Sequence, residues 1–157
     1  MKTALCYSGQ IGAFNKAFNN QKQSFLDDCD DIYSYTSNLI THKGLSFGKF
    51  ERTSDVHEYL KGGVGWRKNI GTYGVAYKVK NELVEDQLSL IKDKLKKSII
   101  EDESLEDTLQ DSNLSKWQWL KKRQLWKMYS CNNLIEGDYD IIVRCRFEFC
   151  KVSSRDS

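Results

Sequence analysis

Apolar and polar residues at the start of the chain predict a strand, a tight turn, a helix and a second strand. Residues 3–7 form a short apolar run that ends in the turn sequence Ser8, Gly9 and Gln10. The segment 31–37 is rich in residues that favour β-structure and is predicted as the second strand. Between them, apolar residues recur at helical spacing on one face: Phe14, Ala17, Phe18 and Phe25. This order is typical of the opening of a parallel α/β sheet.

The second half of the chain predicts two long amphipathic helices. The first runs from about residue 76 to about residue 100, because apolar residues there fall on one helical stripe: Val84, Leu88, Ile91, Leu95 and Ile99. An acidic stretch over residues 101–111 follows and is predicted as a solvated loop or a short helix. The second helix runs from about Ser115, a candidate N-cap, to about Ile135, with Gly137 beyond its end. Its inner stripe is predicted to be Trp117, Gln124, Met128, Cys131 and Ile135.

Residues 38–75 show no clear periodicity: residues 55–60 could form one or two helical turns, and the glycine-rich stretch that follows predicts a loop. Residues 62–66 read Gly-Gly-Val-Gly-Trp, with Gly71 and Gly74 beyond them. The spacing fits neither the GxxxxGK[ST] nor the GxGxxG phosphate-binding pattern. The segment is either a surface loop, which the sequence favours, or a lid over a ligand site.

The last predicted strand, residues 139–149, carries the most chemical information. Alternate residues of a strand face opposite sides, so one side is apolar: Ile141, Val143, Cys145, Phe147 and Phe149. The Ile-Ile-Val run predicts a strand that is covered on both faces. Charged residues gather toward its carboxyl end, where Arg144 and Arg146 suit a phosphate or diphosphate and Glu148 suits a divalent cation. The alternative is a ladder of surface ion pairs on an edge strand.

These elements predict one α/β domain over residues 1–157, with a mainly parallel Rossmann-like sheet and flanking helices. Ligands of open α/β sheets bind beyond the carboxyl ends of the strands. We therefore expect Ser8, Gly9, Gln10, Arg144 and Arg146 to converge on one cleft at that edge.

Composition narrows the functional classes. The chain has 157 residues and a net charge of +2, which is too small to indicate nucleic acid or a membrane surface as a partner. The five cysteines form no CxxC pair and are expected to be reduced thiols, and no zinc site is expected. No apolar run approaches the length of a membrane span or a signal peptide, so we expect a soluble cytoplasmic protein.

Two motifs resemble a group of viral and bacterial GT-A-like glycosyltransferases. One is the apolar strand that runs into Ser8, Gly9 and Gln10. The other is the segment Tyr139 to Glu148, of the type Tyr-Asp-Ile-Ile-x-Arg-x-Arg-Phe-Asp. A helix with Gln, Tyr, Ser and Asn residues precedes that segment in the family, and here it offers Gln124, Tyr129, Ser130, Asn132 and Asn133. The likeness covers about the first 35 and the last 35 residues.

The resemblance implies a GT-A-like nucleotide-binding half, a nucleoside diphosphate sugar as donor and usually Mn²⁺ or Mg²⁺. It places the donor against six residues: Ser8, Gly9, Gln10, Gln124, Arg144 and Arg146. The metal would lie at Glu148, where the family usually carries Asp. The sequence ends eight residues after Phe149, so we expect weak nucleotide binding and no efficient sugar transfer by this chain alone.

Two other functional classes compete with a glycosyltransferase. The segment 116–127 interleaves five basic residues with Trp117, Trp119 and Trp126 and has no acid, a pattern that can bind single-stranded nucleic acid. The sequence favours the simpler explanation, an amphipathic helix with buried tryptophans and solvated lysines, so nucleic acid is an unlikely partner. The other class is an α/β interaction domain without catalysis.

Overall fold

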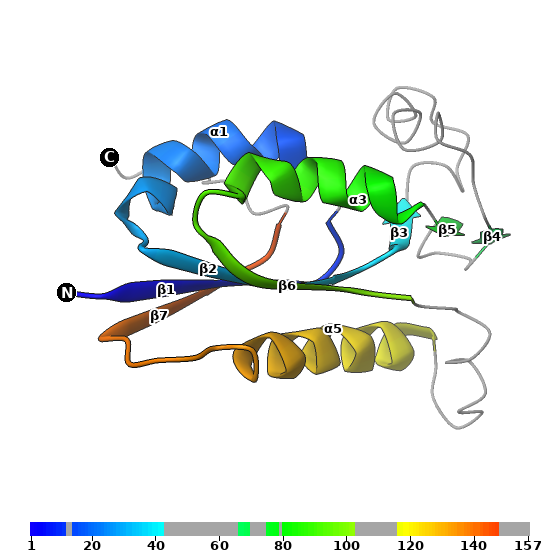
Figure 1. The fold of residues 1–157 in the computed structure, drawn as a ribbon. Helices are drawn as coiled ribbons and strands as arrows, with labels where there is room; N and C mark the ends of the chain where they lie inside the picture. The colour runs from blue at the N-terminus through cyan, green and yellow to red at the C-terminus, as the bar shows by residue number, and fades with distance from the viewer. Residues whose placement is uncertain (12–13, 43–65, 70–74, 79, 103–115, 148–157) are drawn as a thin grey trace, which may run out of the picture.

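The computed structural model describes residues 1–11, 14–42, 66–69, 75–78, 80–102 and 116–147. Within them, four strands form the main sheet, in the order β6-β2-β1-β7 (Figure 1). The strands are β1 (Thr3–Ser8), β2 (Asp31–Ser37), β6 (Leu95–Glu101) and β7 (Ile141–Cys145). Every neighbouring pair is parallel, which confirms the expected α/β fold with a parallel Rossmann-like sheet.

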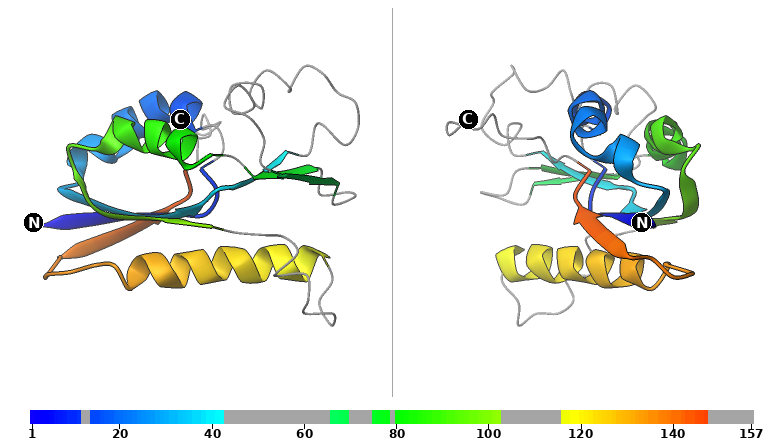
Figure 2. Two further views of the ribbon diagram at one scale, coloured as in Figure 1. Left: turned by 45° about the vertical axis from the view of Figure 1, so that its right-hand side comes forward. Right: turned by 90° about the vertical axis from the view of Figure 1, so that its left-hand side faces the viewer.

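Helices cover both faces of this sheet. Helices α1 (Phe14–Ser24) and α3 (Asn81–Leu88) lie on one face, and α5 (Lys116–Asn132) lies on the other (Figures 1 and 2). Two short 3₁₀ turns, η1 (Leu26–Asp28) and η5 (Ser89–Ile91), follow α1 and α3. The result is a three-layer arrangement in which β1 and β2 are the central strands.

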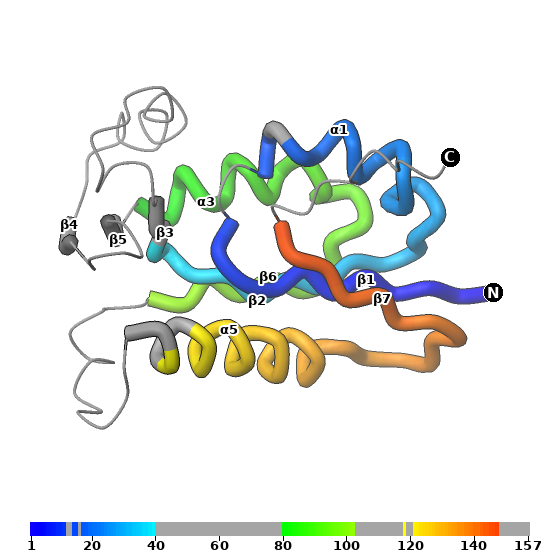
Figure 3. Tube along the Cα trace, turned by 180° about the vertical axis from the view of Figure 1, so that it is seen from behind, coloured from blue at the N-terminus to red at the C-terminus, as the bar shows by residue number. Residues whose placement is uncertain are grey.

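The order of the strands reverses once. The chain winds outward from β1 to β2 to β6 with α1 and α3 on one face. It then crosses back under the sheet through α5 and adds β7 on the other side of β1 (Figure 3). The reversal point of such a sheet therefore lies between β1 and β7.

Each face of the sheet packs against its own apolar cluster. On the α1 and α3 side the buried cluster is Leu5, Tyr7, Ile11, Phe14, Leu26, Cys29, Ile32, Val84, Leu88, Ile91 and Phe147. On the α5 side it is Ala4, Cys6, Tyr33, Tyr35 and Cys131. Alternation along β1 explains the division, because Leu5 and Tyr7 face one layer while Ala4 and Cys6 face the other.

The helix predicted over residues 76–100 is confirmed only over α3 and is otherwise wrong. The chain instead forms strand β5 (Val75–Lys78), then α3, η5 and strand β6. Val84, Leu88 and Ile91 are buried as a helical stripe should be, but Ile99 is 40% exposed because it belongs to an edge strand. The backbone turns at Lys92–Lys94, after which the β-branched pair Ile99–Ile100 fits the sheet better than a helix.

A second, smaller sheet lies beyond the carboxyl end of β2 (Figure 1). It is antiparallel, with the order β3-β5-β4, and contains β3 (Leu39–His42), β4 (Trp66–Asn69) and β5. The expected loop is therefore wrong at Trp66, which starts a strand. Residues 62–65 and 70–74, which hold the glycines of that prediction, and residues 55–60 lie outside the described residues.

The last two predicted elements form, with two corrections. Helix α5 is present, but Met128 is 38% exposed rather than part of the inner stripe, and Ile135 follows the helix. Strand β7 is present, and within the described part of the predicted range 139–149 it runs only over Ile141–Cys145. It is not covered on both faces: Ile141 and Ile142 are 41% and 38% exposed. The reason is that β7 ends the main sheet as described, so its outer edge has no neighbouring strand there.

Candidate functional site

The pairing of β1 with β7 brings the two predicted segments to one edge of the sheet. The register runs from Thr3 beside Ile141 to Tyr7 beside Cys145. One step further, Ser8 ends β1 and Arg146 follows the end of β7, so both residues lie at the carboxyl edge of neighbouring strands. The predicted grouping of Ser8, Gly9 and Gln10 with Arg146 at the carboxyl edge is therefore consistent with the register.

Gly9 makes the turn that follows β1. Its φ is 106°, in the left-handed region that glycine adopts without strain. Its N–H donates to the Tyr35 carbonyl of β2 at 3.2 Å, which ties the turn to the central strands. That amide is thus occupied by the protein and is not a donor for a ligand.

Arg144 and Arg146 are both exposed, and Arg144 lies on the side of β7 that faces α5. The Nη2 of Arg144 donates to Asn132 Oδ1 at 2.6 Å, so the end of α5 orients this guanidinium. Arg144 also lies beside Cys6 in the β1–β7 register. The pKa of the Cys6 thiol is lowered, first by the hydrogen bond from Cys131 and also by the charge of Arg144.

A buried amide supports this edge from the other face of the sheet. Gln21 of α1 is fully buried; its Oε1 accepts from the Tyr7 hydroxyl and its Nε2 donates to the Phe147 carbonyl at 2.8 Å. The Tyr7 and Phe147 rings stack with centroids 4.9 Å apart, and Phe14 packs edge-on against both. These contacts fix the backbone just after Arg146.

Sequence reasoning missed Gln21, although a signal was present. Gln21 follows Phe14 and Ala17 on the inner stripe of α1, so a polar side chain stands where an apolar one is expected. A buried amide at such a position needs polar partners.

A second polar group is buried at the neighbouring strand end. The side chain of Thr36 on β2 is fully buried, and its Oγ1 has no hydrogen-bond partner, the one such buried side-chain atom among the described residues. Thr36 follows Tyr35, whose carbonyl holds Gly9. An unpaired buried hydroxyl costs free energy that a hydrogen bond from a ligand would recover.

The remaining predicted site residues are not brought into this group by any described contact. Gln124 is half-buried in the middle of α5. Glu148 lies outside the described residues, and those that are described contain no group of three side chains suited to hold a metal ion. One of the backbone N–H donors at the start of α1 is already used within the protein, because the Asn15 N–H donates to Gln87 Oε1 at 2.9 Å.

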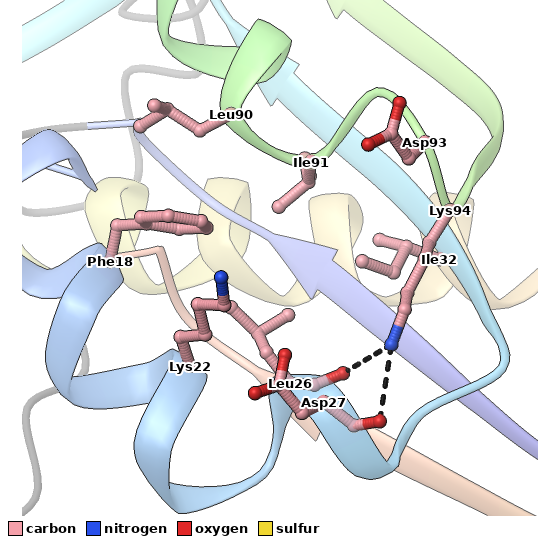
Figure 4. A pocket seen from close by; sticks show the side chains of 9 residues that line it. All are labelled: Phe18, Lys22, Leu26, Asp27, Ile32, Leu90, Ile91, Asp93 and Lys94. Carbon is pink, nitrogen blue, oxygen red and sulfur yellow. Dashed lines mark hydrogen bonds between the residues drawn. The ribbon is translucent and has the colours of Figure 1, made fainter.

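A small hollow lies at the opposite edge of the sheet. It measures about 140 Å³ and lies among η1, η5 and the starts of β2 and β6 (Figure 4), below the ~300 Å³ of common ligand pockets. Beside it, Lys94 Nζ donates to the carbonyls of Leu26, Asp27 and Cys29 at 2.9, 3.3 and 2.7 Å. Lys94 thus satisfies the end of η1.

The expected burial pattern of the basic helix is wrong at two described positions. Trp126 is 44% exposed, whereas Lys127 is 3% exposed. The indole N–H of Trp126 donates to Glu101 at 3.3 Å, and Glu101 also pairs with Arg123. Glu101 of β6 thus anchors one side of α5 through Trp126 and Arg123. The sequence pattern of the helix alone does not predict this contact.

Comparisons with protein-family models, with curated proteins and with solved structures give no match for this chain. Among the described residues, none of the helices combines the length and the apolar character needed to span a membrane.

Proposed function

We propose that this chain binds a nucleoside diphosphate sugar where β1 and β7 end side by side at the carboxyl edge of the main sheet, which we call the β1–β7 edge. The chain then serves as the donor-binding part of a GT-A-like glycosyltransferase. The observation that supports it most is the reversal of strand order between β1 and β7. In open parallel sheets, ligands bind outside the carboxyl ends of the strands at this reversal. Ser8 and Arg144 lie on the two strands that flank it, and Gly9, Gln10 and Arg146 follow the carboxyl ends of those strands.

The side chains present suit the donor. Arg144 and Arg146 are exposed cations at the strand end, and guanidinium groups bind diphosphate oxygens in pairs. In sugar transfer, the bond between the anomeric carbon and the diphosphate oxygen breaks while an acceptor oxygen bonds to that carbon. Positive charge beside the departing diphosphate stabilises it. From the resemblance, Mn²⁺ or Mg²⁺ at Glu148 would share that role.

The proposed compartment is the cytoplasm. Four described cysteines are free thiols: Cys6, Cys29, Cys131 and Cys145. Free thiols are typical of reducing compartments such as the cytosol.

A thermal-shift screen tests the proposal. The probes are nucleoside diphosphates and nucleoside diphosphate sugars, each with and without Mn²⁺. We expect the midpoint of unfolding to rise with one of them, because a ligand at 100 times its Kd adds about 2.7 kcal/mol to stability. A single-stranded oligonucleotide serves as the competing probe. A rise with the oligonucleotide alone would contradict the proposal and favour the nucleic-acid alternative.

Arg146→Gln sharpens the test. Loss of one charge-assisted hydrogen bond weakens binding by about 10- to 150-fold, given ~1.5–3 kcal/mol for such a bond. Lys92→Gln is the matched control, since Lys92 is an exposed cation next to η5, before the start of β6. Equal loss in both variants would show that binding is not located at the β1–β7 edge.

A further inference from the structure

The two edges of the main sheet differ in their protection against pairing. The β6 edge carries two adjacent exposed lysines, Lys96 and Lys97, a common device that keeps an edge strand from joining another sheet. The β7 edge exposes Ile141 and Ile142 instead. These two residues face opposite sides of the sheet, so apolar surface is exposed above and below the same edge.

The exposed apolar surface continues onto α5. Leu125, Met128 and Tyr129 are 55%, 38% and 61% exposed. With Asn132 they stand at helical steps of three, one and three, on one flank of the helix. Asn132 contacts Arg144 on β7, so this flank is the one turned toward the β7 edge.

The residues along β7 are complementary to themselves when a second β7 runs antiparallel. With Ile142 opposite Ile142 of the second copy, Ile141 lies opposite Val143 and Asp140 opposite Arg144. Ile142 and Arg144 share one face of β7, and Asp140 directly precedes the strand, where its Oδ2 accepts from the Lys2 N–H at 2.7 Å. All three residues are exposed. The pairing therefore puts apolar residues in the centre and opposite charges at both ends, as a two-fold interface requires.

We propose that two copies of this chain associate through antiparallel β7 edges centred on Ile142. The two four-stranded sheets then form one continuous sheet. A two-fold axis perpendicular to the sheet keeps both α5 helices on the same side, with the exposed flanks that carry Leu125, Met128 and Tyr129 turned toward each other. Asp140 of the second copy then lies beside Arg144 and helps to orient its guanidinium. This proposal rests on the β7 surface and not on the proposed function.

Sedimentation velocity over about a hundred-fold range of protein concentration tests the proposal, because the fraction of dimer changes as the concentration passes through the Kd of association. We expect a concentration-dependent dimer. Ile142→Lys places like charges across the axis and shifts dissociation to at least about tenfold higher concentration. Ile99→Lys is the matched control, because Ile99 is 40% exposed on the opposite edge of the same sheet. It should leave the dimer unchanged.

A charge exchange provides a second, independent measurement. Asp140→Arg and Arg144→Asp each place like charges at the ends of the interface and should weaken the dimer. The double variant restores opposite charges and should recover it. A wild-type chain that stays monomeric throughout, equal effects of Ile142→Lys and Ile99→Lys, or no recovery in the double variant would each overturn the proposal. Circular dichroism confirms that every variant is folded.

Discussion

Gln21 carries the interactions that hold the end of β7 in place, and its replacement gives the most informative stability test. The side chain lies fully buried between the Tyr7 hydroxyl and the Phe147 carbonyl. Gln21→Met keeps the length of the side chain but removes both hydrogen bonds. Tyr7 and Phe147 are themselves fully buried, so water cannot replace the lost partner.

The expected loss follows from the two stranded groups. Each buried group left without a partner costs about 1–3 kcal/mol. The thioether regains part of this by apolar packing, so we expect the free energy of unfolding to fall by about 2–4 kcal/mol. In a domain of this size each kcal/mol lowers Tm by about 2–4 °C. The midpoint should therefore drop by roughly 4–16 °C.

Urea unfolding followed by circular dichroism measures this loss. The matched control is Gln23→Met, an exposed position on the same helix, which should change stability by less than about 0.5 kcal/mol. Adding Tyr7→Phe to Gln21→Met should cost less than the sum of the two single variants, because no hydroxyl is then left stranded. A Gln21→Met variant as stable as Gln23→Met would refute the described network.

Two further outcomes concern the side chains of Tyr7 and Lys94. Burial raises the pKa of Tyr7 above its ordinary value of 10.0, so the folded state favours the neutral phenol. Stability from this group is present below pH 10.0 and is lost as pH rises above it, so alkaline unfolding should be less steep in Tyr7→Phe. Lys94→Met strips three carbonyls of their donor and should lower the free energy of unfolding by about 1–3 kcal/mol in urea titrations. Lys92→Met, an exposed neighbour, should have little effect; equal losses in both would contradict the role of Lys94.

The elements with strong local patterns could be predicted from the sequence. The apolar run at β1, the β-formers of β2 and the Ile-Ile-Val run of β7 each indicate a strand without help from the rest of the chain. The prediction of one helix over residues 76–100 failed for a clear reason. Val84, Leu88 and Ile91 form a true helical stripe, and Leu95 and Ile99 continue its spacing by coincidence although they lie in β6. β6 is a strand because it pairs with β2, and this pairing joins residues that are far apart in the sequence.

The site could be predicted in part. Parallel strands send their carboxyl ends to one edge, so the grouping of Ser8 with Arg146 follows once both strands are known. The burial of Lys127 could not be predicted, since the exposure of a side chain on α5 depends on how the helix lies on the sheet. The partners of Gln21 come from β1 and from the residue after Arg146, which lie far from it in sequence.

An NMR titration tests the central claim, that a nucleoside diphosphate sugar binds where β1 and β7 leave the sheet. The chain is labelled with ¹⁵N and titrated with the nucleotide sugar that gives the largest thermal shift, in the presence of Mg²⁺, which leaves the spectrum free of paramagnetic broadening. We expect the largest amide shifts at Gly9, Gln10, Arg144 and Arg146. Shifts confined to the opposite edge, around Leu26 and Lys94, or no shifts with any nucleotide sugar, would contradict the account.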